Sequence, residues 1–344
     1  MNPNIMLLLV SNLSLATIIT ALSYHWFLAW IGLEINTLAV IPLLAKQHHP
    51  RATEAATKYF ITQAMASSII LFSSIFNAWH TGVWDITQLS THPAPSLLTL
   101  ALAMKLGLAP LHFWLPEVMQ GTNTTTALII ATSQKLPPMI LLFMTADQLP
   151  NQILLPMAAI SVLIGGWSGL NQTQLRKIMA FSSIGHLGWM AAISTISKKL
   201  LLFTLVIYML MTTSLFLTMI NSTTKTIKDL GVLWTLSPVL STTTMFTLMA
   251  LGGLPPLSGF LPKWLILQEL TTNHLIPTAT FIALASLLSL MFYMRLTFVT
   301  TLTISPNTAN NMMKWRFKPT KLISPSPIIF TTFFLVPITP LIYF

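Results

Sequence analysis

The feature that most constrains the fold is a series of long apolar runs that cover most of the 344 residues. A helix needs about 20 apolar residues to cross roughly 30 Å of hydrocarbon, and most runs are close to that length or longer. The runs lie at about 3–21, 25–44, 54–78, 97–120, 125–145, 151–170, 177–195, 199–220, 238–270, 276–303 and 324–343. They are continuous rather than alternating, which is typical of membrane-spanning helices and not of barrel strands. The sequence therefore predicts an all-α integral membrane protein with about 11 transmembrane helices.

Composition excludes the main alternatives. Only 7% of the residues are charged and 54% are hydrophobic, whereas an ordinary soluble domain has about 25% charged residues. The chain has too few polar groups for a soluble enzyme and is too hydrophobic for a disordered protein. The net charge of +10 does not indicate nucleic-acid binding, because the basic residues are few and sit mostly at the ends of apolar runs. The absence of cysteine excludes disulfides, thiolate-held iron–sulfur clusters and cysteine zinc sites.

The loops differ strongly in basic charge between the two sides. If the spans are numbered 1 to 11, loops after even-numbered spans lie on the N-terminal side. The basic residues on that side are Lys46, Arg51, Lys58, Arg176, Lys177, Lys225, Lys228, Lys314, Arg316, Lys318 and Lys321. Loops after odd-numbered spans carry only Lys198 and Lys199. Because positive loops stay inside, we expect the N-terminus to face the positive-inside compartment and the C-terminus the opposite one.

Two similar segments lie inside apolar runs, GLAPLHFWLP at 107–116 and GLPPLSGFLP at 253–262. Six of their ten positions are identical at an offset of 146 residues. Proline removes a backbone donor and clashes with the preceding turn, so spans 4 and 9 should be discontinuous near mid-membrane. Non-helical backbone is tolerated there only where it is buried in protein or lines a wet cavity. The glycine pairs 165–166 and 252–253 predict close helix packing.

Spans 4 and 9 are five spans apart and therefore run in opposite directions, which is typical of an inverted repeat. The alternative is a chance match between two proline-kinked apolar helices. The repeat predicts a first five-helix bundle at 1–145, a second, inverted five-helix bundle at 151–303, a basic loop at 304–323 and a C-terminal helix at 324–344.

Four ionisable residues lie deep inside the predicted spans, and each costs several kcal/mol to bury. They are Glu34 in span 2, Lys105 in span 4, Lys135 in span 5 and Lys263 in span 9. Glu34 is near the midplane, about 14 Å along its helix, and is the expected partner of Lys105. Lysine suits proton transfer because burial brings its charged and neutral forms closer in free energy. The alternative is an ion pair that only ties helices together.

Three further residues are candidates for a proton relay. Lys263 corresponds to Glu117 at the repeat offset, so one half carries a cation where the other carries an anion. His112 lies within the first break and His186 lies in the middle of span 7. The alternatives are an interfacial carboxylate for Glu117 and hydrogen-bonded packing residues for the two histidines. No glycine-rich nucleotide loop follows a strand, so we expect no redox cofactor on this chain.

Four segments carry a resemblance to a known family: WIGLEIN at 30–36, KLGLAPLHFW at 105–114, GLNQTQLRK at 169–177 and GGLPPLSGFLPKW at 252–264. Together they resemble the antiporter-like membrane subunits of respiratory complex I over essentially the whole chain. The resemblance implies two inverted five-helix bundles, each with a discontinuous helix. Eleven helices match the shortened form found in animals. It also implies that Glu34, Lys105, Lys135 and Lys263 take the family's central charged positions.

The resemblance further implies a proton-translocating subunit of NADH:ubiquinone oxidoreductase in the mitochondrial inner membrane, with its N-terminus in the matrix and its C-terminus in the intermembrane space. NADH, FMN, iron–sulfur clusters and ubiquinone would bind to other subunits. Its partners would be other membrane-arm subunits and inner-membrane lipids such as cardiolipin. Two alternatives stay open, a subunit of a sodium/proton antiporter and a purely structural membrane subunit.

Overall fold

The computed structural model describes residues 3–255 and 257–302. The predicted basic loop at 304–323 and C-terminal helix at 324–344 lie outside the described residues. The elements are α1 (Pro3–Leu22), α2 (Trp26–Leu44), η1 (Ala45–Gln47), α3 (Pro50–Thr81), α4 (Ala94–Leu106), α5 (Trp114–Gly121), α6 (Thr124–Ala131), η2 (Ser133–Lys135), α7 (Leu136–Thr145), α8 (Asn151–Gly169), α9 (Leu175–Ser194), α10 (Lys198–Ser222), α11 (Ile227–Gly231), α12 (Leu233–Leu236), α13 (Pro238–Gly252), α14 (Phe260–Thr272) and α15 (Ile276–Leu302).

The described chain is helical throughout its regular elements, as the continuous apolar runs predict. Within it, seven helical segments are long and apolar enough to cross a membrane, and α4 and α13 are shorter apolar helices. Each of the first ten predicted runs contains a helix or a pair of helices. The eleventh run and the inverted orientation of the two halves stay predictions.

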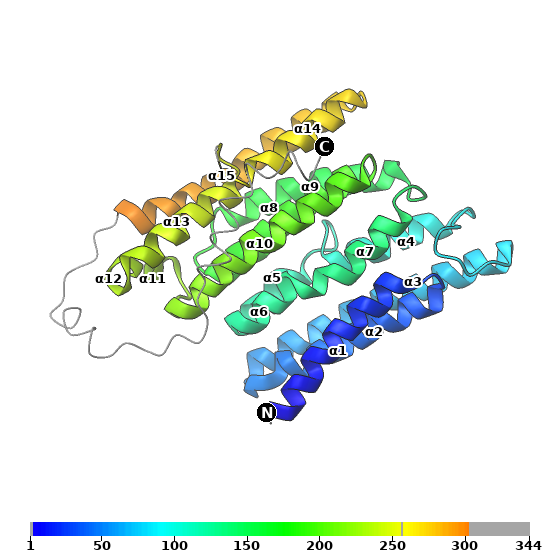
Figure 1. The fold of residues 1–344 in the computed structure, drawn as a ribbon, viewed down its shortest axis with the longest axis horizontal. Helices are drawn as coiled ribbons and strands as arrows, with labels where there is room; N and C mark the ends of the chain where they lie inside the picture. Colours follow the sequence, from blue (N-terminus) through cyan, green and yellow to red (C-terminus); the bar gives the residue numbers. More distant parts are fainter. Residues whose placement is uncertain (1–2, 256, 303–344) are drawn as a thin grey trace. The chain divides into compact units, whose positions relative to one another are not determined.

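Within the described residues the helices form two compact units, residues 3–162 with 187–198 and residues 163–186 with 199–255 and 257–302. In the first unit α1 packs on α2, α2 on α3, and α3 on α4 and α5, and α7 contacts α1, α2 and α4. Figure 1 shows α1, α2 and α3 running alongside one another. A Cβ on Gly32 would lie 2.6 Å from the Thr20 side chain, so this glycine permits the close approach of α1 and α2.

In the second unit α15 contacts α11, α13 and α14. A Cβ on Gly165 would lie 2.7 Å from the Gly185 nitrogen, and one on Gly166 would lie 2.7 Å from Leu288 Cβ. These contacts confirm the predicted close packing at 165–166. The pair at 252–253 has another role, because Gly253 has a φ of 81° and ends α13.

The two predicted breaks are present and have the same backbone geometry. Gly107 has φ 81° and ψ 39°, and Gly253 has φ 81° and ψ 40°. The Leu108 amide donates to the Ala103 carbonyl at 2.9 Å, and the Leu254 amide donates to the Met249 carbonyl at 3.3 Å. These bonds satisfy carbonyls at the helix end in the way that a left-handed glycine allows. Each helix thus stops at its glycine, and α5 or α14 begins several residues later.

A third break differs from the sequence prediction. The apolar run predicts one uninterrupted span at 125–145, but α6 ends at Ala131 and the short 3₁₀ turn η2 leads into α7. Pro137 and Pro138 stand at the start of α7 and have no N–H to donate to the preceding turn. Because proline also clashes with the carbonyl four residues before it, a continuous helix through Ser133 and Gln134 is disfavoured. The break places Lys135 at the end of η2.

Candidate functional site

Glu34 lies in the middle of α2 and is half-buried. Its Oε2 accepts a hydrogen bond from the Thr37 hydroxyl at 3.1 Å, and the same hydroxyl donates to the Glu34 carbonyl at 2.9 Å. Thr37, one turn further along α2, therefore orients the Glu34 carboxylate. The bounds of α2 place Glu34 well inside that helix, and its depth in a membrane stays a prediction.

Lys105 lies in the last turn of α4, two residues before Gly107, and only 5% of its surface is exposed. Among residues 3–255 and 257–302, its Nζ has no hydrogen-bond partner. Glu34 interacts with it electrostatically, but the two do not come within the 4.0 Å of a direct ion pair. The predicted partnership is therefore a charge interaction across a gap and not a contact.

Lys135 ends η2 and is 4% exposed. The residue before it, Gln134, belongs to a hydrogen-bonded group that we call the amide cluster: Asn36, Tyr59 and Gln134. Asn36 Nδ2 donates to Gln134 Oε1 at 3.0 Å, and Gln134 Nε2 donates to Asn36 Oδ1 at 3.1 Å. The Tyr59 hydroxyl donates to Gln134 Oε1 at 2.9 Å.

The amide cluster is absent from the sequence-based candidates. The sequence does contain a local indication of these residues, because Gln134 stands beside Lys135 inside an apolar run and Asn36 follows Glu34 by two residues. The pairing of the two amides spans 98 residues of sequence, so no local pattern could join them.

Lys263 lies in the first turn of α14 and reaches back across the second break. Its Nζ donates to the Gly252 carbonyl at 2.8 Å. The carbonyls at a helix C-terminus carry partial negative charge, so a cation there is stabilised. At the first break a carbonyl in the last turn of α4, that of Met104, accepts from the Trp114 indole Nε1 at 3.0 Å. One break is therefore closed by an ammonium and the other by a neutral indole.

His112 lies in the backbone between α4 and α5 and is 4% exposed, with its ring 4.3 Å from that of Phe113. At the repeat offset the second break carries Ser258, which is also buried. The Ser258 hydroxyl has no hydrogen-bond partner in the described part of the chain. Ser258 was not among the candidates from sequence, although aligning the two breaks points to it directly.

Glu117 is exposed on α5 and forms an ion pair with Lys58 of α3 at 2.7 Å. Lys58 also pairs with Glu54 one turn earlier, at 2.6 Å. Glu117 therefore pairs with Lys58 and not with the buried lysines. The remaining ion pair within residues 3–255 and 257–302 joins Lys198 to Asp147.

His186 lies on α9 in the second unit, with its ring centroid 5.5 Å from that of Tyr208 on α10. The Tyr208 hydroxyl is in turn hydrogen-bonded with Ser183, one turn before His186. His186, which is half-buried, thus lies against two buried side chains, those of Tyr208 and Ser183. In the first unit α7, which directly follows Lys135, contacts both α2, which carries Glu34, and α4, which carries Lys105.

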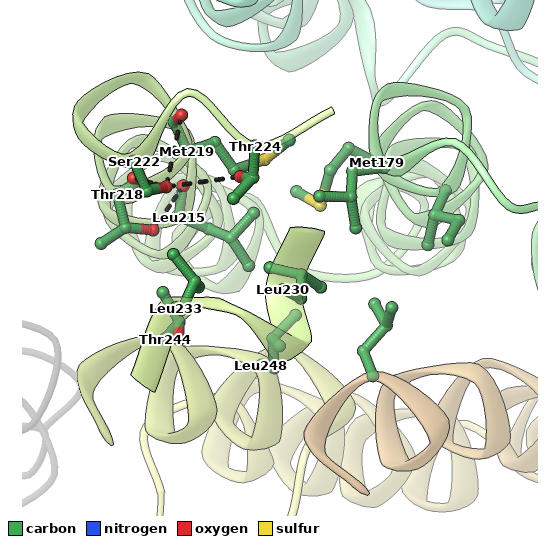
Figure 2. Close-up of a pocket in the computed structure, with 13 residues that line it drawn as sticks. Met179, Leu215, Thr218, Met219, Ser222, Thr224, Leu230, Leu233, Thr244 and Leu248 are labelled. Atoms are coloured by element: carbon green, nitrogen blue, oxygen red, sulfur yellow. Dashed lines mark hydrogen bonds between the residues drawn. The ribbon is translucent and has the colours of Figure 1, made fainter. Parts of the chain in front are cut away.

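A small cavity lies in the second unit, lined in part by Thr224 and by Leu230 of α11 (Figure 2). Its volume is about 20 Å³, and its lining is mostly leucine and methionine with the hydroxyls of Thr218, Ser222, Thr224 and Thr244. A cavity needs about 10–15 Å³ to hold one water, so this cavity is too small for an organic substrate. None of the candidate site residues lines it.

No group of three or more histidine, aspartate or glutamate residues that could hold a metal ion occurs in residues 3–255 and 257–302. Within these residues, the candidate site therefore consists of single ionisable side chains on different helices and not of a ligand cluster.

Comparison with known sequences gives one consistent result. Residues 23–315 match the family described as NADH:quinone oxidoreductase/Mrp antiporter, TM, and residues 290–343 match the NADH dehydrogenase subunit 2 C-terminus. The chain is 53% identical over 343 residues to NADH-ubiquinone oxidoreductase chain 2 of Coturnix japonica. It is 54% identical over 345 residues to that of Struthio camelus, and both matches cover 99% of each sequence.

Solved structures agree. A chain of respiratory complex I from Thermus thermophilus with bound aureothin superposes with a TM-score of 0.83 at 26% identity, covering 98% of this chain and 79% of that one. A chain of the Mrp complex from Dietzia sp. DQ12-45-1b superposes with a TM-score of 0.78 at 18% identity, covering 87% of this chain and 61% of that one. At that identity the second match shows a shared fold only.

Proposed function

Because this chain belongs to the NADH-ubiquinone oxidoreductase chain 2 family and is a membrane subunit of respiratory complex I, we propose that it moves protons across the membrane through Glu34, Lys105, Lys135 and Lys263. In this proposal, electron transfer from NADH to ubiquinone in other subunits drives the movement. NADH, FMN and the iron–sulfur clusters are bound by those subunits too. The lack of cysteine supports the assignment of the iron–sulfur clusters to other subunits, because this chain has no thiolate to ligate them.

The observation that carries the proposal is the setting of Lys105. A buried charge normally has a partner, because an unpaired one costs several kcal/mol. In the described chain the Lys105 ammonium has no hydrogen-bond partner, and the Glu34 charge acts on it without contact. No fixed partner therefore holds Lys105 in one protonation state, and a small change in its distance to Glu34 alters the balance. A lysine tied into a structural ion pair would lack this property.

The breaks supply the surroundings that such a carrier needs. Gly107 and Gly253 end α4 and α13 inside apolar segments, and the backbone beyond them is not helical. Unwound backbone at membrane depth exposes polar groups that can bind water beside a carrier. This arrangement supports an inverted repeat in which each half has one proton path.

His112, His186 and Glu117 complete the proposed path as relay residues. His112 lies in the first break, and His186 lies beside Tyr208 in the second unit. Glu117 and Lys58 form an exposed ion pair where α5 and α3 meet, which suits a site of proton exchange with the surroundings.

The proposed location is the mitochondrial inner membrane, with the N-terminus in the matrix. The basic loops support this orientation. Arg295 donates to the Leu170 carbonyl at 2.6 Å and to the Gln172 carbonyl at 3.0 Å, which joins the end of α15 to the loop after α8 on the basic side. Other complex I subunits surround the chain, and inner-membrane lipids such as cardiolipin cover the remaining apolar surface.

The test is the replacement Lys105→Met in the assembled complex, measured in sealed vesicles as protons translocated per electron. Removing a proton carrier slows its transfer step by about 100-fold or more, so the ratio should fall while assembly is retained. Thr99→Val is the matched control, since Thr99 is buried in the same helix and its hydroxyl bonds to the Ser96 carbonyl within that helix. Full pumping by an assembled Lys105→Met complex would refute the carrier role and favour a structural subunit. Pumping that requires sodium would favour antiporter chemistry.

A further inference from the structure

The amide cluster joins three elements that are far apart in sequence. Asn36 comes from α2, Tyr59 from α3 and Gln134 from η2, and their exposed fractions are 3%, 1% and 8%. The two carboxamides pair reciprocally, and the tyrosine hydroxyl donates a third bond to Gln134 Oε1. Buried polar groups that bond one another in this way fix a single arrangement, because losing one partner leaves the others unsatisfied.

The turn that the cluster holds is otherwise weakly defined. Pro137 and Pro138 deny η2 the hydrogen bonds that would continue a helix through it. Thr132, just before it, has φ −117° and ψ −80°, outside the helical region. The position of this turn against α2 therefore depends on contacts made by its side chains, and Gln134 makes two hydrogen bonds with Asn36 of α2.

Two members of the cluster stand close in sequence to two of the proposed carriers. Gln134 is adjacent in sequence to Lys135, and Asn36 is half a turn beyond Glu34 on α2. Glu34 also interacts electrostatically with Tyr59, so the tyrosine lies near the carboxylate. A carboxamide has no proton that titrates near neutral pH, so the cluster sets geometry without competing for the transferred proton.

We propose that Asn36, Tyr59 and Gln134 are positioning residues, which hold the turn carrying Lys135 against α2 and thereby fix the separation of Lys135 from Glu34. This inference rests on the proposed function of those two residues. A displacement of about 1 Å can slow a transfer step by ~100-fold, so loss of the cluster should impair proton movement in a complex that still assembles.

The first test compares Gln134→Met with the exchange of both amides, Asn36→Gln together with Gln134→Asn. Methionine keeps the volume of Gln134 but makes no amide pair, and coupled turnover per assembled complex should fall by about tenfold or more. The exchange keeps two complementary amides of the same combined length, so it should restore most of the turnover. A structural role would instead lower the amount of complex and leave turnover per assembled complex unchanged.

Controls keep the result interpretable. Thr145→Val in α7 removes a buried hydroxyl whose bond goes to Leu141 in its own helix, so turnover should not change. Tyr59→Phe removes one bond and leaves the amide pair, so it should assemble and lose a few-fold in turnover even if Gln134→Met fails to assemble.

Lys135→Met separates this inference from the proposed function. If Lys135→Met abolishes pumping while assembled Gln134→Met and Tyr59→Phe pump normally, the positioning role is wrong and the carrier role stands. If Lys135→Met itself pumps fully, the carrier role of Lys135 is wrong. Reduced turnover in Gln134→Met that the double exchange restores would support the inference.

Discussion

At the first break α4 ends at Gly107, and the Trp114 indole donates to the Met104 carbonyl; at the second, α13 ends at Gly253, and the Lys263 ammonium donates to the Gly252 carbonyl. The two glycines have the same backbone conformation within 1°. The difference lies in the lysines. Lys105 precedes its break and has no hydrogen-bond partner in the described chain, whereas Lys263 follows its break and is bonded to it.

The same helix-ending glycine conformation is therefore compatible with two different environments for the nearby lysine. Where a neutral indole satisfies the helix end, the nearby lysine is left to respond to a distant carboxylate. Where the lysine itself donates to a carbonyl at the helix end, as Lys263 does, loss of its proton also weakens the hydrogen bond that holds the break together. We therefore expect changes at the second break to affect stability and pumping together, and changes at Lys105 to affect pumping alone.

The largest effect should come from Gly253→Ala. A left-handed φ costs alanine about 1–2 kcal/mol, and the new Cβ would lie 2.8 Å from Lys263 Nζ and 2.9 Å from its Cδ. Both the stability of the complex and its pumping should fall. Gly107→Ala has the same backbone cost, but the nearest atom to its Cβ is the tip of Leu115 at 3.1 Å, so more pumping should remain.

Gly82→Ala supplies the control for backbone strain, because Gly82 has a φ of 73° and a Cβ added there would meet nothing within 4 Å. Thermal unfolding and pumping of the three assembled variants make the measurement. Equal loss of pumping in all three would show that strain alone is responsible and would remove the distinction between the breaks.

The next effect is that of Lys263→Met on stability. Removing a charged hydrogen bond to the end of α13 should cost about 1.5–3 kcal/mol, measured as a lower unfolding temperature of the purified complex. Lys105→Met should leave that temperature unchanged, because within the described chain its ammonium makes no such bond. Equal destabilisation by the two substitutions would contradict the different roles of the two lysines.

A smaller effect is expected for Trp114→Phe. The substitution removes the bond from the indole Nε1 to the Met104 carbonyl and keeps most of the aromatic packing against Tyr59, so it should cost about 1 kcal/mol. Pumping should persist, since no charge is involved. A loss of pumping as large as that of Lys263→Met would mean that closure of the break, and not its charge, is what matters.

The smallest effect lies outside both breaks, at Asp229 in the basic segment before α13. Partial burial raises the pKa of Asp229, but hydrogen bonds from the backbone amides of Lys225 and Thr226, at 2.9 and 2.8 Å, outweigh it and lower the pKa overall. A lowered folded pKa contributes stability above the unfolded pKa, and this contribution disappears as pH falls through the folded value.

Asp229→Asn should therefore lower stability near neutral pH by less than about 1 kcal/mol, because the side chain is only half-buried and solvent screens its charge. The difference in unfolding temperature between the two proteins should shrink as the pH falls below about 4. Pumping should be unchanged at neutral pH. A difference that grows on acidification would contradict the assigned sign.

The parts of the fold that depend on local chemistry could be predicted from the sequence. Long apolar runs predict the helices, and glycine with proline predicts the breaks at 107–116 and 253–262, because both act within a turn of their own position. The break before α7 is open to the same reasoning, since Pro137 and Pro138 are visible in the sequence. The break is missed when spans are assigned by hydrophobicity alone, because the run around these prolines is apolar throughout.

The candidate site was predictable only in its ionisable members. Glu34, Lys105, Lys135 and Lys263 stand out because charge is costly in a membrane. Their partners depend on tertiary packing: Glu117 meets Lys58, Lys263 meets a backbone carbonyl, and the Lys105 ammonium has no hydrogen-bond partner in the described chain. The amide cluster depends on a pairing across 98 residues, which no periodicity reveals.

The coupling between Glu34 and Lys105 is best measured by a double-mutant cycle on protons translocated per electron, using Glu34→Gln, Lys105→Met and both together in the assembled complex. If the two residues act as one unit, each single change lowers the ratio and the double change costs less than the sum, with a coupling of about 0.5–3 kcal/mol. Glu34→Gln with Lys198→Met is the control and should be additive, because Lys198 pairs with Asp147 and neither residue belongs to the proposed path. Additive losses for Glu34 and Lys105, or full pumping by Lys105→Met, would contradict a shared role in proton transfer.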